Sequence, residues 1–148
     1  QEILAEKFDV KASLFSVTSW SELARDAAAK ETAALREGRE PEKAFATSQL
    51  EGFDGPFVGV SDYATDLQEM IRRTVPGDYL TLGADGFGFA DTREGARRFF
   101  NVDDVSIVVA VLTGLAREGK VEWDTVAKAA KEFKLDDPTA TAYDRLEE

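Results

Sequence analysis

Residues 57–82 read FVGVSDYATDLQEMIRRTVPGDYLTL, and this stretch predicts the class of fold. It begins and ends with short apolar runs, at residues 57–60 and 79–82, whose length is typical of buried strands. Between them, apolar residues on one face predict a helix over about residues 65–74, and a Val-Pro-Gly-Asp sequence then forms a turn. A strand, a helix and a second strand in this order predict parallel pairing through a right-handed crossover.

The residues before this unit continue the alternation of helices and strands. A helix is predicted over residues 2–8, and a second helix begins where Ser19 and Glu22 form a capping box and ends near Gly38. Between these helices, the apolar run at residues 14–17 predicts another strand.

The remaining segments are predicted to be a surface connection and two helices. Residues 38–56 are polar and rich in glycine and proline, which predicts a surface connection with at most a short strand or turn. The β-branched run at residues 107–111 is compatible with a strand, but acidic residues before it and basic residues after it favour the two ends of a helix. A last helix is predicted over about residues 124–133, and the domain is expected to span residues 1–138 with a flexible tail at 139–148.

Strands that alternate with helices predict an α/β fold. We expect a three-layer α/β/α architecture with a mostly parallel sheet, followed by carboxyl-terminal helices. In such folds, ligands lie beyond the carboxyl ends of the strands. Three segments are expected at those ends: Thr18-Ser19-Trp20, Ser61-Asp62-Tyr63 and Asp85-Gly86-Phe87-Gly88.

Composition argues against several classes of function. The chain holds 18 basic and 29 acidic residues and a net charge of −11, so it is expected to bind neither nucleic acid nor an anionic membrane surface. It holds no cysteine and no histidine, which removes thiolate chemistry and any catalytic set that depends on imidazole. No apolar run approaches the roughly 18 residues of a membrane span. We therefore expect a cytoplasmic domain without a complete active site of its own.

The glycine-rich segment at residues 83–98 is the main candidate for a ligand site. Gly86 and Gly88 supply the first two positions of a dinucleotide fingerprint, but Asp91 stands where the third glycine is required. A carboxylate at that position has the wrong charge for a pyrophosphate, so we expect a bent loop rather than a phosphate site. The aspartates of the chain also lack the spacing of a metal-binding loop.

A basic helix is predicted after this loop, with Asp91 and Glu94 capping its amino-terminal end. Arg93 and Arg97 lie one turn apart and share a face, so they could bind an anion or contact another domain. The alternative is that these arginines, with Arg98, form a solvated or ion-paired face. The candidate contact residues are Asp85, Gly86, Phe87, Gly88, Arg93 and Arg97, and no catalytic, cofactor-binding or metal residue is predicted.

Three long stretches of the chain together resemble one known family. They are FSVTSWSELARD, VGVSDYATDLQEMIRRTVPGDYLTLGADGFGFADTREGARRFF and VVAVLTGLAREGKVEWDTVAKAAKEFKLDD. They resemble the C-terminal, transketolase-C-like domain of the first component of the pyruvate dehydrogenase complex, of the bacterial homodimeric type. The resemblance covers about residues 2–138, with D-G-F-G and then D-T-R at residues 85–93 as its most specific marker. It is weakest over residues 31–56, and Ala90 stands where the family commonly has serine.

The resemblance implies a parent enzyme that decarboxylates pyruvate on thiamine diphosphate with magnesium. That enzyme then acetylates the lipoyl group of the dihydrolipoyl acyltransferase component. The family holds its cofactor, metal motif and catalytic residues in other domains, so this domain is expected to support the homodimer and the assembled complex. The family's domain also begins with a strand ahead of the helix at residue 2, which the chain is expected to lack.

Two alternatives to a supporting domain stay open from the residues themselves. One is a small-anion-binding or regulatory domain that uses the loop at residues 85–98. The other is a purely structural dimerisation module with no ligand.

Overall fold

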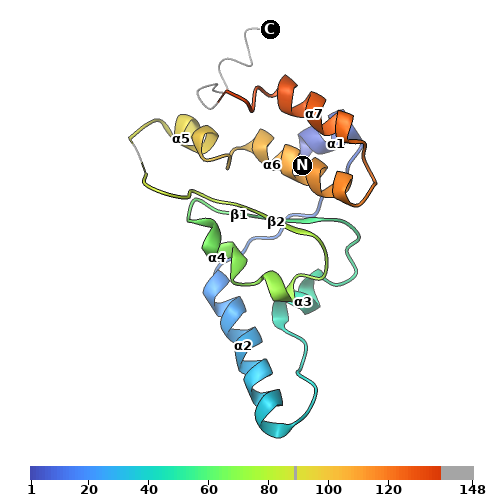
Figure 1. The fold of residues 1–148 in the computed structure, drawn as a ribbon, viewed down its shortest axis with the longest axis vertical. Coiled ribbons are helices and arrows are strands. Elements are labelled where there is room, and N and C mark those ends of the chain that lie inside the picture. Colours follow the sequence, from blue (N-terminus) through green and yellow to red (C-terminus); the bar gives the residue numbers. More distant parts are fainter. Residues whose placement is uncertain (89, 138–148) are drawn as a thin grey trace.

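Two short parallel strands form the middle layer of the molecule. The computed structural model describes residues 1–88 and 90–137, and the strands are β1 (Phe57–Val60) and β2 (Tyr79–Leu82). Phe57 lies opposite Tyr79 and Val60 opposite Leu82, in parallel register. Helices cover both faces of this pair (Figure 1). The predicted three-layer α/β/α fold with a parallel sheet is therefore confirmed.

One face of the sheet is covered by the helices from the two ends of the described chain. These are α1 (Glu2–Phe8), α6 (Asp104–Arg117) and α7 (Trp123–Glu132). They share a core cluster in which Val105 and Leu112 of α6 are almost fully buried. As predicted, α6 is a helix despite its β-branched residues, because Asp103 accepts a hydrogen bond from the Ser106 amide at 3.0 Å and caps its first turn.

The opposite face carries α2 (Trp20–Glu37), α3 (Phe45–Leu50), α4 (Thr65–Glu69) and the 3₁₀ turn η1 (Arg72–Thr74). The predicted cap of α2 is confirmed, since Ser19 accepts a hydrogen bond from the Glu22 amide at 3.2 Å. Two predictions are wrong here. Residues 45–50 form a helix where a strand or turn was expected, and the helix predicted over 65–74 divides after Glu69.

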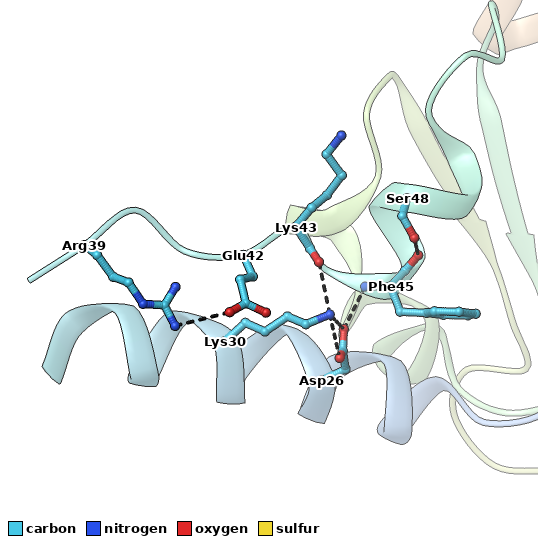
Figure 2. Close-up of polar contacts among 7 residues, drawn as sticks. All are labelled: Asp26, Lys30, Arg39, Glu42, Lys43, Phe45 and Ser48. Atoms are coloured by element: carbon cyan, nitrogen blue, oxygen red, sulfur yellow. Dashed lines mark hydrogen bonds and ion pairs between the residues drawn. The ribbon is translucent and has the colours of Figure 1, made fainter. Parts of the chain in front are cut away.

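Helix α2 projects from the body of the molecule, and a polar network joins it to the returning chain (Figures 1 and 2). The Asp26 carboxylate accepts a hydrogen bond from the Phe45 amide at 2.7 Å and pairs with Lys30 at 2.9 Å. Lys30 also donates to the Lys43 carbonyl at 3.0 Å. The Phe45 amide and then Lys30 lower the pKa of Asp26 below its usual value. This carboxylate therefore fixes the start of α3 to the middle of α2.

The prediction of a strand at residues 14–17 is wrong. This segment is neither helix nor strand, and its side chains are exposed, with Leu14 at 83 %. Phe15 packs edge-on against Phe53, with ring centroids 5.3 Å apart. A segment forms a β-strand only when its backbone bonds to a neighbouring strand, and an apolar pattern within the segment does not ensure that such a strand lies beside it.

By length and composition alone, the stretch Arg93–Arg117 is apolar enough to cross a membrane, although charged residues interrupt its apolar runs. In the structure it contains two separate helices, α5 (Arg93–Phe99) and α6. The buried side chains of α6 form the protein core, which explains the high hydropathy. The tail predicted at residues 139–148 lies outside the described residues.

Candidate functional site

The two strands end side by side, so the segments that follow them meet at one edge of the sheet. The Ser61 amide donates to the Leu82 carbonyl at 3.2 Å, just beyond the last register pair. Gln68 of α4 is fully buried, and its Nε2 donates to the Ser61 hydroxyl at 2.7 Å and to the Leu82 carbonyl at 3.2 Å. Gln68 therefore joins the ends of both strands to α4.

The loop after β2 is held against the turn after β1. Asp85 accepts hydrogen bonds from the amide and the hydroxyl of Thr65, each at 2.8 Å. The Ala84 amide donates to the Tyr63 carbonyl at 2.9 Å. Gly83 leaves no space for a side chain, since a Cβ there would lie 2.5 Å from the Tyr63 carbonyl oxygen. Asp85 therefore has a structural partner, and its negative charge would oppose an anion.

The tip of this loop presents an aromatic side chain to solvent. Gly86 has a φ of +90°, a backbone conformation that side-chain-bearing residues rarely adopt. Phe87 follows it and is 99 % exposed. Tyr63, in the neighbouring turn, is 72 % exposed, so it lacks the desolvated setting that a proton-transfer role would require.

The capping residue of helix α5 lies one position after the predicted Asp91. Thr92 is the capping residue, and its hydroxyl accepts a hydrogen bond from the Gly95 amide at 3.1 Å. Asp91 instead accepts from the Thr92 amide at 2.6 Å. The prediction that Asp91 and Glu94 cap this helix is wrong, because the threonine hydroxyl takes that place.

Arg98 does not belong to the exposed basic face. It is 1 % exposed, its Nε lies 3.3 Å from a carboxylate oxygen of Asp103, and it donates to the Phe133 carbonyl at 3.2 Å. At 100° per residue, a position five residues after Arg93 points well away from it. The helical period thus explains why Arg98 turns inward while Arg93 and Arg97 stay outside.

Arg93 and Arg97 line a shallow hollow of about 360 Å³ at the carboxyl edge of the sheet. The other lining residues are Asp62, Ala84, Gly88, Ala96, Phe100 and Val102. Arg97 pairs with Asp62 at 3.2 Å. Within residues 1–88 and 90–137, Arg93 has neither a hydrogen-bond nor an ion-pair partner. The hollow therefore offers one guanidinium group to a ligand or a partner.

The structure brings together part of the predicted site. Gly88, Arg93 and Arg97 line the hollow, and Gly86 and Phe87 precede Gly88 in the same loop. The segment at residues 18–20 does not follow a strand, and its serine caps α2.

The sequence interpretation missed the apolar part of the lining. Ala96 and Phe100 share the hollow with Arg93, and they follow it by three and seven residues. That spacing marks one face of a helix and could have identified both residues. Val102 gave no such signal, because it enters the hollow only through the turn that follows α5.

The described lining of the hollow does not fit thiamine diphosphate with magnesium. Two guanidinium groups and one carboxylate face the hollow, and that carboxylate is already paired with Arg97. Among the described residues, no three acidic side chains gather as a metal-binding group. Diphosphate-bound magnesium takes oxygen ligands from the protein, and Asp62 is the one carboxylate among the described lining residues. We therefore derive no catalytic step from these residues.

Comparison with known proteins connects this arrangement to a family. A profile described as the transketolase-like TK C-terminal domain matches residues 1–103. The chain belongs to this domain family. The matched part of the domain includes both strands, the glycine-bent loop and α5, and so it contains all of the hollow.

Relatives with this domain are named as enzymes. The chain is 57 % identical over 143 residues to a pyruvate dehydrogenase E1 component of Corynebacterium glutamicum, covering 96 % of the chain and 16 % of that protein. It is 48 % identical over 140 residues to the same component of Mycobacterium tuberculosis (94 % of the chain and 15 % of that protein). It is 39 % identical over 136 residues to the pyruvate dehydrogenase E1 component of Escherichia coli, covering 91 % of the chain and 15 % of that protein. The chain thus spans about a sixth of the length of these relatives.

Proposed function

We propose that this chain is the C-terminal, non-catalytic domain of a pyruvate dehydrogenase E1 component. The observation that carries this proposal is the identity of 57 % over 143 residues with a protein of that name. The parent enzyme would decarboxylate pyruvate on thiamine diphosphate with magnesium and acetylate the lipoyl group of its dihydrolipoyl acyltransferase partner. It would work in the cytoplasm as a homodimer.

In this proposal, the domain contributes surface and stability rather than chemistry. Neither a histidine nor a cysteine occurs in the chain, and the part of the chain that the structure describes contains no group of three or more acidic residues that could hold a metal ion. The hollow and the loop at residues 85–88 would contact other domains of the parent enzyme, because they lie at the carboxyl edge of the sheet.

The test compares the full-length enzyme with the 148-residue chain. We expect the full-length enzyme to acetylate a lipoyl domain from pyruvate in preference to other 2-oxo acids. The 148-residue chain should bind no thiamine diphosphate in calorimetry and release no CO₂ from pyruvate, while circular dichroism shows that it is folded. Tight cofactor binding by the chain, or a full-length enzyme without activity on pyruvate, would contradict the proposal.

A second candidate function is a small-anion-binding or regulatory domain. It is favoured by one observation: the guanidinium group of Arg93 lines the hollow and has no polar partner among the described residues. Calorimetry of the chain with pyruvate, inorganic phosphate and nucleotides separates the two candidates. Saturable binding that Arg93→Ala abolishes would favour the anion site over a purely supporting role.

A further inference from the structure

The loop after β2 presents Phe87 from a firmly held base. Asp85 and Ala84 bond to the turn at residues 63–65, and the tight approach at Gly83 fixes how closely the two segments pack. Phe87 extends from this base with 99 % of its surface exposed. A phenylalanine so fully exposed buries almost no apolar area within the domain, and aromatic side chains are common anchors in protein interfaces.

The hollow beside this loop is basic in a strongly acidic protein. Its described lining contains two arginines and one aspartate, which sum to a charge of +1, while the chain carries −11. Arg93 occupies the first turn of α5, where the helix dipole disfavours a cation, so helix stability does not explain its position. The Arg93 guanidinium group, which has no partner within residues 1–88 and 90–137, is complementary to a carboxylate, which arginine binds through two parallel hydrogen bonds.

We propose that this edge docks an acidic segment from another domain of the parent enzyme. A carboxylate of that segment pairs with Arg93 in the hollow, and an apolar pocket next to the carboxylate receives Phe87. The inference rests on the proposed function, since the chain spans 16 % of the length of its Corynebacterium relative and most of that protein lies outside it. The docked surface joins the alanine and phenylalanine lining of the hollow to the exposed loop tip.

Thiol labelling in the full-length enzyme tests the docking. The chain contains no cysteine, so Phe87→Cys introduces one new thiol into it, and the unsubstituted enzyme gives the background from other domains. Leu35→Cys is the matched control, because Leu35 is 83 % exposed and lies in the last turn of α2. Helix α2 projects from the body of the molecule (Figure 1). We expect position 87 to react with a maleimide at least about tenfold more slowly than position 35 in the native enzyme. Both should react equally in urea.

A charge reversal tests the carboxylate. In the Phe87→Cys enzyme, Arg93→Glu should raise labelling at position 87 by about tenfold, because like charges then oppose docking. Arg36→Glu, at the exposed end of α2, is the control and should leave labelling unchanged. Arg93→Gln, a milder variant, should raise labelling by a smaller factor.

Each outcome decides a separate point. Equal labelling at positions 87 and 35 in the native enzyme overturns the docking, because the Phe87→Cys enzyme keeps Arg93, which should still hold the acidic segment over the loop. Protection at position 87 that Arg93→Glu leaves intact overturns the role of the carboxylate. If position 87 is protected from the maleimide only when pyruvate or phosphate is added, the ligand of the hollow is a small anion, and the proposed acidic segment is rejected. Full activity on pyruvate with an unprotected position 87 would reject the docking alone, whereas a wild-type enzyme inactive on pyruvate would reject the proposed function.

Discussion

Arg98 is a buried charge at the junction of three helices. It bonds to Asp103, the cap of α6, and to the Phe133 carbonyl at the end of α7. Removing one member of such a pair leaves the other charge buried without compensation, which commonly costs several kcal/mol. Arg98 therefore contributes to the stability of the fold, whereas Arg93 and Arg97 on α5 are exposed.

We expect Arg98→Met to lower the free energy of unfolding of the chain by about 3 kcal/mol. The methionine fills the space but leaves Asp103 without its guanidinium partner. Urea denaturation measures the change, and Arg93→Met should shift stability by less than about 0.5 kcal/mol. A loss below about 1 kcal/mol for Arg98→Met would show that the pair adds little to stability.

Glu69 makes stability depend on pH in the acidic range. Hydrogen bonds from Arg72 and then Thr81 hold the pKa of Glu69 at about 2, against an ordinary 4.5. A lowered pKa in the folded state stabilises the protein above pH 4.5, and this contribution is lost as pH falls from about 4.5 to about 2. The Glu69 side chain is 34 % exposed, so solvent screening limits the contribution to about 1 kcal/mol.

Glu69→Gln should therefore flatten the loss of stability between about pH 4.5 and pH 2. The measurement is urea denaturation of both proteins at several pH values in that range. Glu94→Gln, on the exposed surface of α5, is the control and should leave the slope unchanged. An identical slope in Glu69→Gln and the unsubstituted chain would contradict the assignment.

At the scale of elements, Asp85 is the contact that joins the loop after β2 to the start of α4. Its carboxylate accepts from the amide and hydroxyl of Thr65, and so takes the role of a helix cap supplied from another segment. Asp85→Ala should raise hydrogen exchange of the Thr65 amide by about tenfold, equivalent to about 1.4 kcal/mol. Asp54→Ala, which removes an exposed ion pair with Lys120, is the control. An unchanged Thr65 amide would show that packing alone holds the loop.

The sequence predicted the start of a helix correctly where a nearby side chain caps its first turn, as Ser19 and Asp103 do. Asp103 caps α6 by accepting a hydrogen bond from the amide three residues later, that of Ser106. With this cap the segment forms a helix, although β-branched residues follow. The segment at residues 14–17 had an equally clear apolar pattern but no strand partner to pair with, so its prediction failed. Local hydrogen bonds can be inferred from spacing, whereas a β ladder depends on residues far away in the chain.

The same distinction explains the candidate site. Its two loops were predictable, because both follow apolar runs that form strands. The pairing of Arg97 with Asp62 joins residues 35 positions apart, and the burial of Gln68 depends on how α4 packs against both strands. Such contacts follow from the arrangement of elements in space, which the spacing of residues in one segment does not determine.

At the scale of the whole molecule, the two helical layers are unequally anchored. Helix α6 has seven buried residues in fourteen, whereas α2 has one, Ala34, in eighteen. The alanine-rich sequence and the two caps of α2 favour a helical conformation there. A largely exposed helix nevertheless gains little stability from tertiary packing. The network around Asp26 is therefore a main link between α2 and the rest of its layer.

We expect hydrogen exchange to divide the molecule along these layers. Amides of α6 should exchange near the rate of global unfolding, and those in the last three turns of α2 at least about a hundredfold faster. Asp26→Asn should further accelerate exchange at residues 38–45, because the neutral amide loses the pairing with Lys30 and weakens the bond from the Phe45 amide. Exchange in α6 should not change, and Glu31→Gln, at an exposed position of α2, should leave residues 38–45 unchanged. Uniform protection of α2 and α6 would mean that the projecting helix unfolds only with the core, and the unequal burial would then not govern local stability.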